Sequence, residues 1–160
     1  MLTPIIILIL LSCPLAIAFV YSKLKSKTLN ITKYASWGLG ISFIFFFIGH
    51  IVKAQGMVEM LPLWVPFRLA LIYLTGLLEL VIGIALFLPK YRLIAAKLAI
   101  VVFVVFFPAN IYAALNSTGL GGHQLGPVYL AIRGPLQLIL IAWTYFLCVK
   151  GHNKAIKSDS

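Results

Sequence analysis

Five long apolar stretches, separated by charged, proline and glycine residues, account for most of the chain. They run from Pro4 to Tyr21, from Tyr34 to Val52, from Phe67 to Leu88, from Leu93 to Leu115 and from Val128 to Val149. A helix needs about 20 residues to cross the roughly 30 Å of bilayer hydrocarbon. The longest apolar runs do not alternate with a period of two, as the strands of a membrane barrel would. The pattern therefore predicts an all-α membrane protein with five transmembrane helices.

Composition agrees with this pattern. Of the 160 residues, 62% are hydrophobic and 10% are charged. Soluble domains have about 45–50% apolar and about 25% charged residues. A soluble domain of this size could not bury so much apolar surface, so the composition excludes that class. The length allows one domain.

The basic residues predict the orientation of the spans. The chain has a formal net charge of +10, from 13 Lys and Arg and 3 acidic residues. With five spans, one side of the membrane holds Lys23, Lys25, Lys27, Lys33, Lys90, Arg92, Lys97, Lys150, Lys154 and Lys157, and the other holds Lys53, Arg68 and Arg133. Basic residues near span ends favour the cytoplasmic side. We expect a multi-pass protein of a bacterial cytoplasmic membrane, with the N-terminus outside and the C-terminus inside. Short separate Lys clusters do not form a nucleic-acid-binding domain, so no nucleic-acid partner is expected.

The first stretch has two interpretations. Residues 10–13 resemble a lipoprotein cleavage box and residues 16–18 a signal-peptidase site, and cleavage would leave four spans. A secretory signal normally begins with positive charge, whereas here the lysines follow the apolar run. We therefore expect a retained N-terminal transmembrane helix with a basic loop over 1–33, a four-helix membrane bundle over 34–149 and a polar cytoplasmic tail over 150–160.

Glu79 is the clearest polar residue at membrane depth. It lies about 18 Å from the outer end of the third stretch at helical rise. Thr75, Glu79 and Gly83 share one helix face with Gly76 beside it, and small residues there let another helix approach closely. An ionisable side chain at this depth needs a partner or a water-filled cavity. We expect Glu79 to belong to a ligand, proton or ion site; the alternative is a protonated carboxyl that bonds one helix to another.

Arg133 and Gln137 lie four residues apart, on one face of the fifth stretch. They begin roughly 8 and 14 Å from the outer surface, so Gln137 falls near the depth of Glu79. We predict that Arg133 pairs with Glu79, directly or through water, because the pair lowers the cost of both charges. The alternative is that Arg133 extends outward to the interface.

Asn110 and His50 add polar groups from two further helices. Pro108 interrupts the helical hydrogen bonding near Asn110, and the freed carbonyls invite polar partners; local bonding and a ligand contact both remain open for Asn110. His50 lies near the outer end of the second stretch, where a packing role is favoured over metal binding. His123 lies in a Gly-rich outer segment that forms either a simple turn or a cover for the site.

Together these residues predict a polar pocket between helices in the outer half of the membrane. Its expected members are His50, Glu79, Asn110, Arg133 and Gln137. They lack the ligand set of a closed zinc site, so no metal is assigned. No Ser/His/Asp grouping or paired-histidine motif identifies a catalytic residue.

The order of several short motifs resembles the DoxX-like family of small membrane proteins. The matching pieces are Gly49-His50, then 73–79 with Gly83 and Pro89, then 107–110, and finally 132–137 with Ala142-Trp143. The resemblance implies a four-helix membrane bundle, to which the first helix is an addition. It also implies that Glu79, Asn110, Arg133 and Gln137 form a common polar core. Gly134 replaces an expected larger apolar residue, which leaves room beside the pocket.

The resemblance further implies an accessory redox role, because the family name points to subunits of quinone-linked oxidases and of thiosulfate oxidation, and relatives accompany thiol-redox proteins. We expect an accessory membrane subunit that binds a small molecule such as a quinone, with a membrane or redox protein as partner, or a second copy of the chain. If the protein is an enzyme, it is a subunit of a membrane oxidoreductase. The alternatives are a small-molecule or proton-coupled transporter and an assembly factor that packs on partner helices.

Overall fold

The computed structural model describes residues 2–117 and 127–152, and all regular structure in these ranges is helical. The elements are α1 (Leu2–Lys25), α2 (Ile31–Val52), α3 (Ala54–Val58), α4 (Arg68–Phe87), α5 (Arg92–Leu115), α6 (Pro127–Trp143) and the π-helix η2 (Thr144–Lys150). Five helical segments are long and apolar enough to cross a membrane, the last of them formed by α6 and η2 together. The prediction of five helices long and apolar enough to cross a membrane is confirmed for the described residues. The short helix α3 was not predicted.

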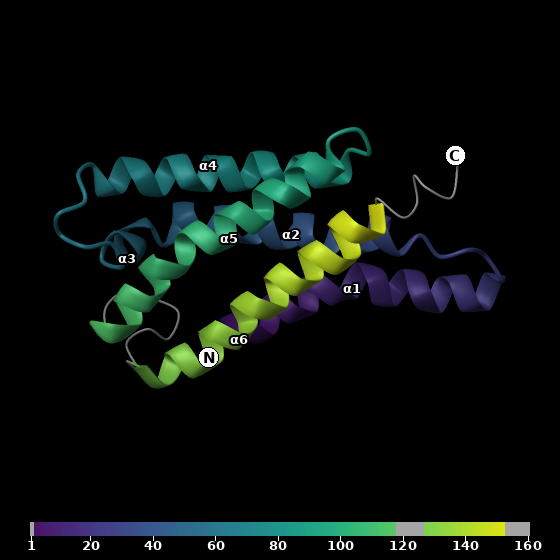
Figure 1. Cartoon of the computed structure of the whole chain (residues 1–160), viewed down its shortest axis with the longest axis horizontal. Coiled ribbons are helices and arrows are strands. Elements are labelled where there is room, and N and C mark those ends of the chain that lie inside the picture. Colours follow the sequence, from purple (N-terminus) through teal and green to yellow (C-terminus); the bar gives the residue numbers. More distant parts are fainter. Residues whose placement is uncertain (1, 118–126, 153–160) are drawn as a thin grey trace.

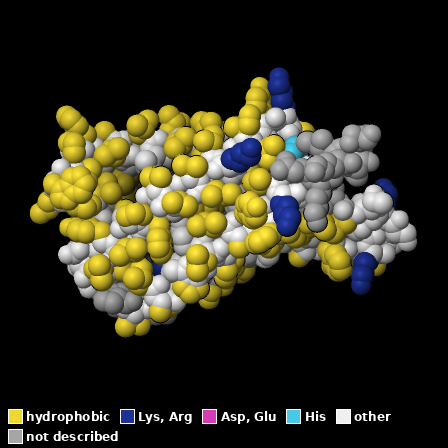
Figure 2. Space-filling view, in the orientation of Figure 1, with side chains coloured by type: hydrophobic (Ala, Val, Ile, Leu, Met, Phe, Trp, Pro, Cys, Tyr) yellow, Lys and Arg dark blue, Asp and Glu magenta, His cyan; other side chains and the backbone are white. Residues whose placement is uncertain are grey.

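Helix α2 occupies the centre of the molecule. It packs against α4, α1 and η2, and α5 packs against α4, α6 and η2. The turns at 26–30 and 88–91 and the end of η2 lie at one end, on the right in Figure 1, while α3 lies at the opposite end. We call these the lysine-rich end and the α3 end, since most of the Lys and Arg visible in Figure 2 lie toward the first of them.

Small residues bring the neighbouring helices of α2 close to its backbone. A Cβ built on Gly38 would lie 2.0 Å from the Leu11 carbonyl oxygen, so α1 docks on α2 backbone to backbone. On α4, a Cβ on Gly83 would lie 3.2 Å from the Gly40 carbonyl oxygen. The prediction that small residues on the Glu79 face admit another helix is confirmed.

The end of α2 determines how deep His50 lies. The chain leaves α2 at Lys53 and continues through α3, which packs beside the first turns of α4. Helix α4 therefore begins beyond the end of α2. Gly40 lies beside Gly83 and His50 lies beside Gly76, so His50 is level with the middle of α4. The apolar pattern of the sequence predicts His50 near the outer surface and Glu79 much deeper. The predicted difference in depth is wrong, because α2 ends beside the middle of α4 and the first turns of α4 extend past the end of α2.

Arg92 caps the C-terminal end of α4, at the lysine-rich end of the molecule. Its guanidinium donates hydrogen bonds from Nε to the Leu86 carbonyl (3.2 Å) and from Nη2 to the Phe87 carbonyl (3.4 Å). Arg92 is buried. These are carbonyls of the last helical turn, which have no donor within the helix. The sequence analysis counted Arg92 only as a positive flank of the span.

Candidate functional site

A buried ion pair joins α2 to α4. His50 Nε2 lies 3.2 Å from Glu79 Oε2, and the two residues are 8% and 4% exposed. The pair lies among the apolar side chains of both helices. Burying one of these groups alone would cost several kcal/mol, about the cost of an unpaired charge in a protein interior. Each residue therefore lowers the free-energy cost of burying the other.

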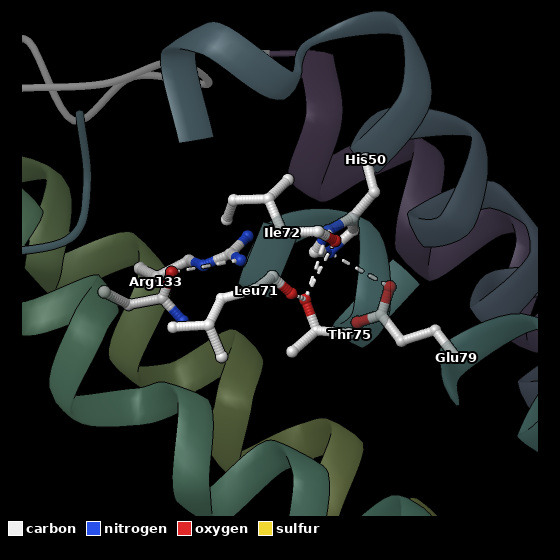
Figure 3. Close-up of polar contacts among 7 residues, drawn as sticks. His50, Leu71, Ile72, Thr75, Glu79 and Arg133 are labelled. Atoms are coloured by element: carbon white, nitrogen blue, oxygen red, sulfur yellow. Dashed lines mark hydrogen bonds and ion pairs between the residues drawn. The ribbon is translucent and has the colours of Figure 1, made fainter. Parts of the chain in front are cut away.

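The backbone of α4 holds the imidazole in place from its other side. His50 Nδ1 lies 2.7 Å from the Ile72 carbonyl oxygen. The Thr75 hydroxyl lies 3.5 Å from the same nitrogen and donates to the carbonyls of Leu71 (2.8 Å) and Ile72 (3.0 Å). Figure 3 shows the ring between these groups and the Glu79 carboxylate. Both ring nitrogens therefore have a fixed oxygen neighbour.

The contacts of His50 place a hydrogen on one of its ring nitrogens. A carbonyl oxygen only accepts, so Nδ1 carries a hydrogen and donates to Ile72. Glu79 Oε2 has no hydrogen-bond partner of good geometry among the described residues, so its 3.2 Å contact with Nε2 is electrostatic. A proton shared by the two groups makes either an imidazolium beside a carboxylate or a carboxylic acid beside a neutral imidazole, and with that proton the pair has no net charge.

A second set of polar contacts joins α5 to α6. Arg133 Nη2 donates to Asn110 Oδ1 over 3.5 Å, and Gln137 Nε2 donates to the Phe103 carbonyl. Asn110 and Gln137 are buried, whereas Arg133 is half-buried. The Phe103 carbonyl lies one residue before the carbonyl that Pro108 leaves without a helical donor. The predicted partner for the carbonyl freed by Pro108 stays a prediction, because Gln137 binds the neighbouring carbonyl and Asn110 accepts from Arg133.

Arg133 connects the two sets through its charge. It acts electrostatically on the Glu79 carboxylate, while the ion pair that the carboxylate makes at 3.2 Å is with His50. The sequence predicts that Arg133 pairs with Glu79, directly or through water, and this pairing stays a prediction. The sequence pattern did not identify His50 as a contact of the carboxylate.

All five predicted site residues lie among the described residues, from four helices: α2, α4, α5 and α6. We call this set the polar cluster: His50, Glu79, Asn110, Arg133 and Gln137. His123, the predicted loop residue, lies outside the described residues. The Ile72 carbonyl was missed, because no side-chain pattern marks a backbone acceptor. Thr75 was placed on the correct face without its role at the imidazole.

Two grooves lie at the α3 end, where α2, α3 and α4 meet. One, of about 340 Å³, is lined by residues 51–56 together with Leu69 and Tyr73. The other, of about 590 Å³, is lined by Val58 and by residues between 63 and 70. Within 2–117 and 127–152 no three His, Cys, Asp or Glu side chains gather as metal ligands. The polar cluster itself offers hydrogen-bond donors and acceptors and two titratable groups, His50 and Glu79.

Comparison with known protein families gives a match for most of the chain. Residues 39–148 match a family described as a domain of unknown function (DUF8561). The chain belongs to this family. The DUF8561 region covers more than two thirds of the chain and contains the whole polar cluster, whereas α1 precedes it. No curated protein and no solved structure matches the chain.

Proposed function

We propose that this protein is an accessory subunit of a membrane redox system, and that its polar cluster binds a quinone or a similar carbonyl-bearing molecule. One observation carries the proposal. The His50–Glu79 pair is buried between α2 and α4, and each ring nitrogen of His50 lies beside an oxygen atom of α4. Quinone reduction and oxidation exchange protons, and ionisable groups at membrane depth mark ligand or proton sites. The resemblance to DoxX-like proteins supports the redox setting.

We place the cluster in a four-helix bundle of α2, α4, α5 and α6–η2, with α1 outside it. The packing of α2 on α4 and η2, and of α5 on α4 and α6, supports this arrangement. We orient the lysine-rich end toward the cytoplasm by the distribution of basic residues. The His50–Glu79 pair then faces the outer half of a bacterial cytoplasmic membrane.

The residues of the cluster take different roles in this proposal. Arg133 is half-buried and has five N–H donors, so it is the group that meets a ligand oxygen. Asn110 orients it. The His50–Glu79 pair supplies or accepts the proton. Gln137 holds α6 against α5 through the Phe103 carbonyl and acts as a positioning residue.

Gentle extraction from native membranes tests the proposal. Native mass spectrometry of the purified protein should detect a bound quinone, and a membrane oxidoreductase should copurify with it. The Arg133→Gln variant should lose the quinone, whereas Arg68→Gln, an equal loss of charge at the start of α4, should keep it. Wild-type protein that carries no quinone and takes up none from solution would exclude this function.

A proton-coupled carrier is the second candidate, and the His50–Glu79 pair again favours it. A buried pair that holds one exchangeable proton is suited to proton coupling. Proteoliposomes that contain the protein would show substrate-dependent proton flux if it is a carrier. An accessory subunit would show none.

A further inference from the structure

Three large apolar side chains at the α3 end are almost fully exposed. Leu63 and Trp64 are each 82% exposed, and Phe67 is 83% exposed. They lie in the segment that joins α3 to α4, and Figure 2 shows apolar side chains over this end of the molecule, on the left. Exposed apolar patches mark surfaces that contact a membrane or a partner, and Trp is common where a protein meets the lipid headgroups. The exposure indicates that this segment lies at the membrane interface.

The two grooves at the α3 end share one wall. Leu69 lines both the groove of about 340 Å³ and the groove of about 590 Å³, so the two adjoin along the start of α4. The larger groove is bordered mainly by apolar side chains, whereas Lys53, Gln55 and Tyr73 bring polar groups to the smaller one. Both volumes are within the range of about 300–1,000 Å³ that is usual for small-molecule sites. We call the two together the Leu69 groove.

Two cations border the Leu69 groove. Lys53 lines its smaller part and is exposed, and Arg68 lines its larger part and is half-buried. Glu59 lies on the same segment, but within residues 2–117 and 127–152 it forms no ion pair with either of them. Long basic side chains lay their stems on apolar surface and hold their charge at the interface. The groove therefore combines positive charge with apolar surface, which matches an anionic amphiphile.

We propose that the Leu69 groove binds one anionic phospholipid of the surrounding leaflet. Its phosphate lies at Arg68 and Lys53, and one acyl chain lies along the apolar wall of the larger groove. A guanidinium suits this role because it donates two parallel hydrogen bonds to a phosphate. A zwitterionic lipid brings a cation of its own beside the phosphate, so it gains less from the two basic side chains. The proposal requires only a membrane setting and does not depend on what the polar cluster binds.

The backbone at Phe67 supports a site that a ligand completes. Phe67 precedes α4 with a φ of 50°, a left-handed conformation that is unfavourable for a bulky residue. Its side chain lines the larger groove and makes few contacts within the chain, as its exposure shows. Unfavourable backbone conformations of this kind cluster at ligand sites. The turn thus holds an aromatic ring at the groove wall, where an acyl chain would cover it.

Quenching of Trp64 fluorescence by brominated lipids tests the proposal at this end of the molecule. In the full-length protein with Trp37→Phe and Trp143→Phe, Trp64 is the remaining tryptophan. The protein is reconstituted in phosphatidylcholine bilayers with equal fractions of brominated phosphatidylglycerol or brominated phosphatidylcholine. Phosphatidylglycerol should show at least about fivefold higher relative affinity, the contribution of one basic residue near an anionic lipid. Equal quenching by the two lipids would overturn the proposal.

Charge variants test the role of the two cations. Arg68→Gln and Lys53→Gln should each reduce the preference for phosphatidylglycerol, and the double variant should bring it within about twofold of equal binding. Arg68→Lys should retain most of the preference because it keeps the charge. Lys90→Gln is the control, since it removes an exposed charge in the turn at the lysine-rich end. It should leave the preference unchanged. A full preference in the double variant would contradict the assignment of the phosphate to Arg68 and Lys53.

Ala70→Phe distinguishes a groove from general attraction of anionic lipid to basic residues. Ala70 lines the larger groove and is exposed, so a phenyl ring there occupies the proposed acyl-chain position while both cations remain. The lipid can then no longer bring its phosphate to them, and the preference should fall by at least about threefold. An unchanged preference would mean that no groove is involved, and the proposal would be wrong. If neither lipid quenches Trp64, protein covers this surface, for example a second copy of the chain, which would also overturn the proposal.

Discussion

Gly76 lies directly against the imidazole of His50, so close that a Cβ on the glycine would come within 2.7 Å of His50 Cβ and 3.1 Å of Cγ. Real Cβ atoms do not approach other atoms to 2.7 Å, so one of the two helices would have to move. Because Gly76 has no side chain, His50 can approach α4 closely. This close approach brings His50 to Glu79, which lies less than one turn further along α4.

Gly76→Ala should destabilise the protein by about 1–3 kcal/mol, the usual cost of an added group in a packed core. Thermal unfolding in detergent measures this change. Gly134→Ala is the matched control, because a Cβ there meets no described atom within 4 Å. Alanine is also favoured over glycine within a helix, so the control should unfold at or slightly above the wild-type temperature. Equal stability of the two variants would show that the contact at Gly76 relaxes at no cost.

The His50–Glu79 pair should appear as an energetic coupling. His50→Leu leaves Glu79 buried without its ion-pair partner, and Glu79→Leu does the same to His50, so each single change should cost about 3–5 kcal/mol. The double variant replaces both by apolar side chains and should recover a large part of the loss. The double-mutant cycle measures this coupling. Strictly additive losses would show that the two residues act independently.

The same cycle applied to Glu79 and Arg133 should give a smaller coupling. Arg133 acts on the carboxylate electrostatically, whereas His50 contacts it at 3.2 Å. Coulomb energy falls with distance, so we expect a coupling below that of the His50–Glu79 pair. A larger value for Arg133 would mean that it, and not His50, is the main partner of the carboxylate.

Arg92→Gln should lower the unfolding temperature, because two hydrogen bonds to the last carbonyls of α4 are lost. Hydrogen bonds from charged donors contribute about 1.5–3 kcal/mol each, and a part of this remains if the glutamine reaches one carbonyl. Lys97→Gln removes the same charge from an exposed position on the same helix. This control should be neutral within about 0.5 kcal/mol.

Cysteine labelling in intact cells tests the orientation. In a background with Cys13→Ala and Cys148→Ala, Glu59→Cys at the α3 end should react with a membrane-impermeant maleimide, and Lys27→Cys should react after the cells are opened. Glu59 and Lys27 are both exposed. The opposite labelling pattern would reverse the orientation inferred from the basic residues.

The number of spans could be read from the sequence because a bilayer imposes a simple requirement of length and hydrophobicity on each helix. The members of the polar cluster could be listed for a similar reason, since polar residues at membrane depth are few. Which of them pair depends on where each helix ends. The turn at Lys53 into α3, which places His50 beside Gly76, has no clear marker in the apolar pattern.

The role of Ile72 could not be predicted either. Its carbonyl contacts His50 Nδ1 although its side chain is an ordinary buried isoleucine. Backbone acceptors are present at every position, so only the three-dimensional register selects one. Arg92 shows the same limit, because its charge marks the side of the membrane while its hydrogen bonds depend on the turn between α4 and α5.

The hydrogen bonds and the ion pair of the polar cluster fall into two helical hairpins. The short-range contacts of His50 and Glu79 stay within the α2–α4 hairpin, and those of Asn110, Arg133 and Gln137 stay within the α5–α6 hairpin. Two interactions described here join the hairpins: the hydrogen bonds from Arg92 of α5 to the last carbonyls of α4 at the lysine-rich end, and the electrostatic interaction between Arg133 and Glu79. A displacement of one hairpin against the other that pivots at Arg92 would leave the hydrogen bonds within each hairpin intact and change the separation of a cation from a carboxylate. Hairpin motion and proton affinity at Glu79 would then be thermodynamically linked, so a ligand that moves α6 would also change where the shared proton resides.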